Sequence, residues 1–151
     1  MKVAFDTSVL VAGLHRAHPH HRRSFVWMDA VAEGRVTGIV TWHALAEFWS
    51  VLTRLPLSAR PSPEQTLQLV DRLRDAFDVR ALDAAVYGEA LRRCTERNFS
   101  SGVIFDALHL VAAEHAGADA LLTFNTADFL RLALPTSPRI AIPPDPPDLR
   151  I

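Results

Sequence analysis

The sequence predicts a single α/β domain in which helices cover both faces of a parallel sheet. Short apolar segments alternate with longer segments of helical periodicity along the 151 residues, and this alternation is typical of parallel strands joined by helices. The apolar segments are nearly continuous, as expected of strands that are buried on both faces. No internal repeat or linker divides the chain, so we expect one domain over residues 1–142 and a proline-rich tail over residues 143–151.

Short apolar runs mark the predicted strands. Four of these runs are bounded by turn or cap residues, and a fifth, weaker candidate lies near the C-terminal end. The predicted strands are Lys2–Phe5, Val36–Val40, Asp78–Leu82, Ala120–Phe124 and Arg139–Ile142.

The predicted helices have recognisable starts and stops. Thr7 or Ser8 is able to cap the first helix, Thr41 caps the helix that Pro56 ends, and Ser62-Pro63 is a typical cap with proline in the first turn. The predicted helices cover residues 7–14, 20–33, 42–55, 63–77, 83–98, 103–116 and 125–132.

Composition and charge exclude some classes of protein and restrict how a nucleic-acid partner would be bound. Apolar residues make up 49% and charged residues 22% of the chain, which excludes a disordered protein, and no uncharged stretch is long enough to span a membrane. Because the net charge is −1, a nucleic-acid partner has to be held by a local patch or through a metal ion. The single Cys94 allows no internal disulfide, and Asp6 interrupts the apolar run that a signal peptide needs, so we expect a cytoplasmic protein.

Two carboxylates stand out, one at a predicted strand end, where open α/β sheets carry their functional sites, and one in an apolar helix. Asp6 follows the first strand; it suits a helix cap, but the neighbouring Thr7 and Ser8 are able to cap the helix instead and leave Asp6 free. Asp106 lies in a helix that is apolar nearly all round. It therefore needs either the helix dipole or a cation to offset its burial, and His109 shares its face of the helix.

Three further polar residues are candidates for the same site. Glu47 lies opposite the apolar stripe of its helix and, taken alone, fits a solvated side chain paired with Arg54. Asn125 and Asp128 follow the fourth strand as ordinary turn and cap residues, but they face Asp6 if the first and fourth strands are neighbours. Several carboxylates in one cleft require a cation, because their repulsion otherwise raises their pKa values. Oxygen ligands suit Mg²⁺ or Mn²⁺, and the reaction class is then hydrolysis of a phosphodiester or phosphate ester.

At these residues the sequence resembles the PIN-domain nucleases, most closely the VapC-type toxins of bacterial toxin–antitoxin pairs. The resemblance extends in order and spacing to about Ile142, and it is carried by Phe5–Leu10, Glu47, Phe105–Ala113 and Leu122–Phe129. It implies a five-stranded parallel sheet sandwiched between helices. It also implies an endoribonuclease that hydrolyses RNA with water activated by Mg²⁺, for which Mn²⁺ can substitute.

The resemblance also implies roles for individual residues and for partners. Asp6, Glu47 and Asp106 match the three acidic metal ligands, and Asp128 is taken as a fourth catalytic acid, with Asn125 as the alternative at that place. Supporting polar side chains are then Thr7, Ser8 and Asn125. The family's partners are an RNA substrate, a small antitoxin whose tail covers the cleft, and a second copy of the chain in a homodimer.

Two other functions remain open from the sequence. One is a PIN-like module that binds RNA or protein and does not cleave. The other is a Mg²⁺-dependent phosphatase that uses Asp6 as its nucleophile. The usual signature of such phosphatases has a second Asp two residues on, where this sequence has Ser8.

Three groups of residues receive no catalytic role. The histidines between His15 and His21 match no structural zinc pattern, so we expect an exposed loop near phosphate groups. Core or dimer packing is expected of the tryptophans, Trp27, Trp42 and Trp49. A solvated helix face is expected of Arg92, Arg93 and Arg97.

Overall fold

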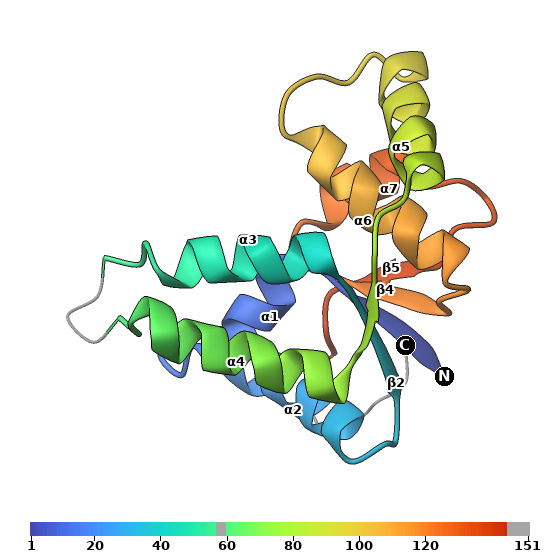
Figure 1. The fold of residues 1–151 in the computed structure, drawn as a ribbon. Helices are drawn as coiled ribbons and strands as arrows, with labels where there is room; N and C mark the ends of the chain where they lie inside the picture. Colours follow the sequence, from blue (N-terminus) through green and yellow to red (C-terminus); the bar gives the residue numbers. More distant parts are fainter. Residues whose placement is uncertain (57–59, 145–151) are drawn as a thin grey trace.

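Five parallel strands form one sheet in the order β3-β2-β1-β4-β5 in the computed structural model, which describes residues 1–56 and 60–144 (Figure 1). The α/β class and all of the predicted strands are confirmed. The strands are β1 (Lys2–Phe5), β2 (Thr37–Thr41), β3 (Asp78–Arg80), β4 (Ala120–Leu122) and β5 (Arg139–Ala141). Most of the predicted tail, from residue 145 onward, lies outside the described residues, so its assignment stays a prediction.

Helices cover both faces of this sheet (Figure 1). One face carries α1 (Thr7–Leu14), α2 (His21–Ala32), α3 (Trp42–Leu52) and α4 (Pro63–Ala76). The other face carries α5 (Ala84–Glu96), α6 (Val103–His115) and α7 (Thr126–Leu132). No helix in the described part of the chain is long and apolar enough to cross a membrane.

Each face of the sheet packs against its own apolar core. Alternate residues of a strand point to opposite faces. In β1, Val3 and Phe5 accordingly enter the core under α1–α4, and Ala4 enters the core under α5–α7. Because β1 is covered on both faces, the near-continuous apolar run that predicted it is explained by the structure.

Local capping interactions set several helix boundaries as predicted. The Thr41 hydroxyl accepts a hydrogen bond from the Ala44 backbone N–H at 2.9 Å, at the start of α3. Ser62 and Gln65 form a reciprocal capping box at the start of α4. The end of α3 was predicted three residues too late, because the ring of Pro56 would meet the carbonyl of Leu52 in a continuing helix.

The core prediction holds for only one of the three tryptophans. Trp27 is fully buried, whereas Trp42 and Trp49 on α3 are 48% and 40% exposed. The buried stripe of α3 is made by Leu45, Phe48 and Leu52, which leaves the two tryptophans on the outer side of the helix. Dimer packing of these two residues stays a prediction.

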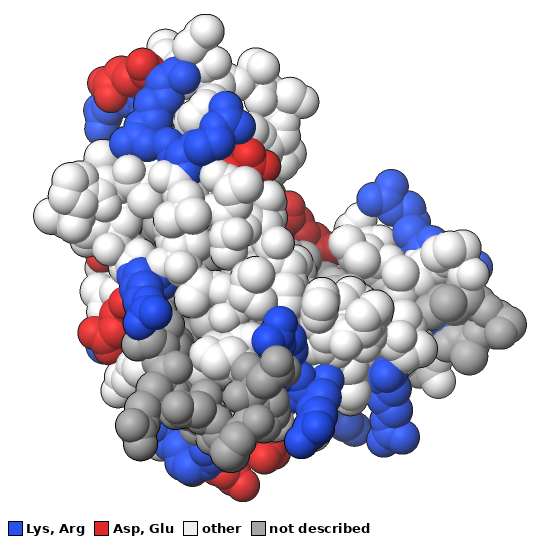
Figure 2. Space-filling model, turned by 180° about the vertical axis from the view of Figure 1, so that it is seen from behind, with Lys and Arg blue, Asp and Glu red and all other residues white. Residues whose placement is uncertain are grey.

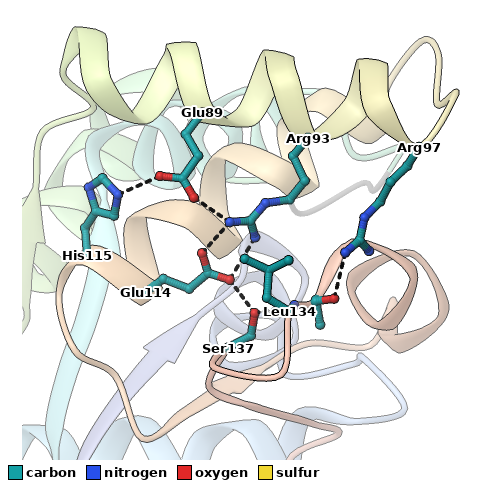
Figure 3. Close-up of polar contacts among 8 residues, drawn as sticks. Glu89, Arg93, Arg97, Glu114, His115, Leu134 and Ser137 are labelled. Atoms are coloured by element: carbon teal, nitrogen blue, oxygen red, sulfur yellow. Dashed lines mark hydrogen bonds and ion pairs between the residues drawn. The ribbon is translucent and has the colours of Figure 1, made fainter.

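The prediction of a solvated arginine face on α5 was wrong for Arg93. Its guanidinium is only 5% exposed and donates to both carboxylate oxygens of Glu114 on α6, at 2.8 and 2.7 Å, and to Glu89 at 2.5 Å (Figure 3). Arg97 donates to the backbone carbonyls of Arg131 and Ala133. These contacts tie α5 to α6 and α7, whereas Arg92 is exposed as expected.

Gly38 in β2 is expected to tolerate no larger side chain. A Cβ atom at this position would lie 2.6 Å from the Phe77 ring and 2.7 Å from a Val31 methyl group. Gly38→Ala should therefore lower the free energy of unfolding by about 1–3 kcal/mol, measured by urea denaturation. Gly88→Ala in α5 is the matched control, because open space surrounds Gly88 and alanine favours a helix by up to about 1 kcal/mol. Equal stability of the two variants would contradict this prediction.

Candidate active site

Three of the four predicted acidic residues, Asp6, Glu47 and Asp106, line a cleft of about 630 Å³ at the carboxyl ends of the strands. Asp6 follows β1, and Asn125 lies just beyond β4, which pairs with β1 as the sequence analysis required. Glu47 reaches the cleft from α3, and Asp106 and His109 reach it from α6. Figure 2 shows acidic side chains at the base of a notch between the lobe of α3 and α4 and the lobe of α5–α7.

Asp6 occupies the N-cap position of α1, but its side chain does not cap the helix. Instead, its Oδ2 atom accepts hydrogen bonds from the hydroxyls of Ser8, at 2.6 Å, and Thr123, at 2.9 Å. Within the described residues, no hydrogen bond reaches its other oxygen, Oδ1. The buried carboxylate is therefore held by one oxygen and keeps the other for a ligand.

Thr7 and Ser8 were predicted as alternative caps of α1, and this role is wrong. Both residues lie inside the first turn of the helix, and their hydroxyls donate to carboxylates of the cleft. The Thr7 hydroxyl donates to Glu47 Oε2 at 2.7 Å, and the Ser8 hydroxyl donates to Asp6 Oδ2 at 2.6 Å. The two hydroxyls therefore orient acidic groups rather than end a helix.

Glu47 is paired with histidines, not with Arg54 as the solvated interpretation required. Its Oε2 lies 2.9 Å from His109 Nε2, and its Oε1 lies 3.5 Å from His43 Nε2. On the other side of the His109 ring, Nδ1 lies 3.3 Å from the Thr41 hydroxyl. Burial raises the pKa of Glu47, but the hydrogen bonds from His109 and Thr7 outweigh it and bring the pKa below its ordinary value. Glu47 is therefore ionised at neutral pH.

Asp106 carries the most strongly shifted carboxyl group of the cleft. Its pKa is raised to about 6 by burial, and then by repulsion from Asp6 and Asp128. The amide of Asn125 donates to Asp106 Oδ2 at 3.1 Å. The crowding of negative charge around Asp106 is the arrangement that a bound cation would relieve.

Asn125 and Asp128 lie together, but they differ in their place in the cleft. The Asn125 amide also donates to Asp128 Oδ2 at 3.0 Å, so it bridges Asp128 to Asp106. Asn125 lines the cleft. Asp128 is not among the residues that line it and pairs with Arg131 at 3.2 Å. This geometry favours Asn125 as the polar group nearest to Asp106, while a catalytic role for Asp128 stays a prediction.

The cleft contains residues for which the sequence predicted no catalytic role. His18, Pro19 and His20 of the histidine-rich loop line it, and the His20 ring stacks on Phe124 with 4.5 Å between the ring centroids. The clustered histidines signalled a loop near phosphate groups, but only the tertiary structure brings that loop to the acidic residues. Thr123, which holds Asp6, had a weaker signal as a polar residue at a strand end.

The donor set fits a divalent cation. The side chains of Asp6, Glu47 and Asp106 offer carboxylate oxygens, which are the ligands preferred by Mg²⁺ and Mn²⁺. None of the residues that line the cleft in the described part of the chain is Lys or Arg, and His109, which pairs with Glu47, forms no hydrogen bond or ion pair with Asp6 or Asp106.

Comparison with known proteins agrees with the resemblance seen in the sequence. The PIN domain family model matches residues 3–134. Ribonuclease VapC27 of Mycobacterium tuberculosis is 37% identical over 115 residues, which cover 75% of this chain and 78% of the relative. Ribonuclease VapC40 of the same species is 33% identical over 120 residues, which cover 79% of this chain and 84% of the relative.

Solved structures share the fold at lower sequence identity. VapBC2 from Rickettsia felis, solved with a DNA fragment from its promoter, has a TM-score of 0.68 at 19% identity and covers 94% of this chain and 98% of its own. VapC20 of Mycobacterium tuberculosis, described as a toxin that cleaves the sarcin-ricin loop, has a TM-score of 0.66 at 16% identity and covers 83% and 92%. Since the family model spans most of the sequence and relatives exceed 30% identity, the chain belongs to the PIN-domain family, with VapC ribonucleases among its relatives.

Proposed function

We propose that this protein is a Mg²⁺-dependent endoribonuclease and the toxin of a toxin–antitoxin pair. The observation that carries the proposal is the convergence of Asp6, Glu47 and Asp106 at one edge of the sheet, in a cleft whose described lining contains neither Lys nor Arg. Relatives named VapC ribonuclease support RNA as the substrate. The enzyme is a hydrolase of phosphodiester bonds, and RNA as its substrate favours a cytoplasmic location.

The three carboxylates of Asp6, Glu47 and Asp106 would hold the cation, and Mn²⁺ is the expected substitute for Mg²⁺. A bound cation would lower the pKa of a water molecule that it binds, and it would stabilise the charge that develops on the phosphate. The remaining chemistry of the site comes from the protein's own side chains.

Hydrogen bonds fix the orientation of each carboxylate. The hydroxyls of Ser8 and Thr123 hold one oxygen of Asp6, and Thr7 with His109 keeps Glu47 ionised and immobile. The amide of Asn125 positions Asp106 from the opposite wall. Such preorganised groups lower the barrier because they need little rearrangement during the reaction.

The proposed partners are an antitoxin and a second copy of the chain. Toxin–antitoxin complexes are among the solved structures that share the fold, including one from Klebsiella pneumoniae. An acidic cleft whose described lining contains neither Lys nor Arg suits an antitoxin segment that brings a basic side chain. A homodimer is proposed from the resemblance to the family.

Cation binding is expected to weaken in mild acid. Because the pKa of Asp106 is about 6 without a cation, the group is ionised at pH 7 and mostly protonated at pH 5. A proton must then leave before the cation binds, so Mn²⁺ affinity should be roughly tenfold lower at pH 5 than at pH 7. Isothermal titration at both pH values measures this. Asp106→Asn should show weaker binding with a smaller pH dependence, and equal wild-type affinities at the two pH values would contradict the prediction.

Cleavage of total RNA by the purified chain, freed of antitoxin, tests the proposed function. Reactions contain Mg²⁺, Mn²⁺ or a chelator, and the cut ends are mapped. Discrete fragments that need the cation are expected. A folded protein that binds cation but cleaves no RNA would overturn the nuclease and favour a binding module. Phosphate covalently trapped on Asp6 would favour the phosphatase.

A further inference from the structure

A second group of candidate metal ligands adjoins the acidic cleft. His43 and Glu47 are one helical turn apart on α3, and His109 faces them from α6. One donor atom from each side chain lies within 4.8 Å of the other two. Two imidazole nitrogens and one carboxylate oxygen form a different donor set from the all-oxygen set of Asp6, Glu47 and Asp106.

We propose that His43, Glu47 and His109 form a binding site for Zn²⁺. Nitrogen with oxygen ligands is the preference of Zn²⁺ and related transition-metal ions, whereas Mg²⁺ prefers oxygen alone. Catalytic zinc sites usually have three protein ligands and leave the remaining coordination position to water or substrate.

The observed distances are close to those that such a site needs. Ligand atoms at typical zinc bond lengths in a tetrahedron are roughly 3.4 Å apart. Glu47 Oε2 lies 2.9 Å from His109 Nε2, and Glu47 Oε1 lies 3.5 Å from His43 Nε2. When each side chain offers one ligand atom, the three atoms all lie within 4.8 Å of one another. The His43 side chain is 24% exposed, so it has room for the small movement that closes the remaining gap.

Two further contacts prepare the histidines as ligands. The Nε2 atom of His43 is buried and makes no hydrogen bond with any residue that the structure describes, while the ring itself stacks on Phe105. His109 presents Nε2 to Glu47 and has Nδ1 at 3.3 Å from the Thr41 hydroxyl. An outer hydrogen bond of this kind orients a metal-binding imidazole and selects its tautomer.

Zinc binding should inhibit the nuclease because both sites need Glu47. A Zn²⁺ ion held by His43, Glu47 and His109 draws this carboxylate away from Asp6 and Asp106, and two adjacent divalent cations repel each other. This consequence rests on the proposed function, whereas the binding of Zn²⁺ does not.

Zinc titration against a chromophoric chelator at neutral pH tests the site. His43→Gln is the main variant, because His43 is only partly buried and belongs to neither apolar core. Compared with the wild type, this variant should bind one zinc ion fewer, or bind that ion roughly 100-fold more weakly. The matched control is His115→Gln, since His115 also bonds a glutamate, Glu89 at 2.9 Å, but among residues 1–56 and 60–144 it belongs to no group of three candidate ligands. His115→Gln should bind zinc as the wild type does.

The Asp106→Asn variant distinguishes zinc binding at the proposed site from cation binding in the acidic cleft. It should retain zinc binding, because Asp106 is not one of the three ligands. Unchanged zinc binding by His43→Gln, or loss of zinc by Asp106→Asn, would overturn the proposal. Circular dichroism of each variant confirms that it is folded, and Co²⁺ substitution should give visible absorption bands that His43→Gln abolishes.

RNA cleavage at fixed Mg²⁺ tests the inhibitory consequence. Added Zn²⁺ should slow the wild type more than it slows His43→Gln, each compared with its own rate without zinc. Zinc binding without inhibition would overturn the coupling through Glu47. If the wild type cleaves no RNA in Mg²⁺ alone, the proposed function fails, and the zinc titration still decides the binding site.

Discussion

Asp106→Asn is expected to abolish RNA cleavage and, at neutral pH, to make the metal-free protein more stable. The carboxylate is a proposed cation ligand, so its loss should reduce the cleavage rate by a factor of ~1,000 or more, equivalent to about 4 kcal/mol of transition-state stabilisation. The fold should persist, because an asparagine oxygen still accepts the hydrogen bond that Asn125 now donates to Asp106.

The gain in stability follows from the direction of the pKa shift. Burial and neighbouring acids raise the pKa of Asp106 from 3.8 to about 6. Between these values the folded state binds more protons than the unfolded state, so stability falls as the pH rises through this window. At pH 7 the penalty is fully present, and Asp106→Asn removes it. Allowing for solvent screening of a partly exposed group, the gain is about 1 kcal/mol.

Thermal unfolding without added cation at pH 7 and pH 4 measures this effect. The variant should exceed the wild type in melting temperature at pH 7, and the difference should disappear at pH 4. Asp29→Asn, at an exposed position of α2, is the matched control and should change neither stability nor cleavage. Cleavage by Asp106→Asn at the wild-type rate would contradict its place in the site.

Arg93→Met should cause the largest loss of stability among the substitutions considered. The guanidinium makes three hydrogen bonds to Glu89 and Glu114 at the interface of α5 and α6. Methionine fills much of the same space, but it leaves the Glu114 carboxylate, which is 13% exposed, without its counter-charge. Breaking a buried ion pair from one side lowers the free energy of unfolding by about 3–5 kcal/mol. Urea denaturation measures the loss.

Two comparisons identify the unpaired charge as the cause. Arg92→Met changes the neighbouring exposed arginine and should alter stability by less than about 0.5 kcal/mol. Adding Glu114→Gln to Arg93→Met should recover part of the loss, because the amide removes the uncompensated charge. If Arg93→Met is as stable as Arg92→Met, the buried network contributes no stability.

Local sequence signals predicted the order of elements and the fold class. Thr41 and Ser62 each accept a hydrogen bond from the backbone N–H three residues further along the chain. Such local contacts do not depend on distant parts of the fold. The strands were also predictable from local sequence, because a strand that is buried on both faces appears as a short, nearly continuous apolar run. The pairing of β1 with β4 then brought Asp6 and Asn125 to one edge, as expected.

Partners distant in the sequence were not predictable in this way. Taken alone, Glu47 fitted a solvated side chain beside Arg54, but it bonds His109, 62 residues away. Arg93 was expected in solvent, but it binds Glu114, 21 residues away. Periodicity shows which face of a helix is apolar, but it does not show which polar residues of another helix lie opposite.

The sequence by itself therefore determined the α/β fold, the acidic residues Asp6, Glu47 and Asp106, and the family. Only the tertiary structure decided how these acids are held, that His109 and His43 adjoin Glu47, and that the histidine-rich loop reaches the cleft. Caps and strands depend on interactions over a few residues of chain. The environment of a buried carboxylate instead depends on how α3 and α6 approach each other across the edge of the sheet.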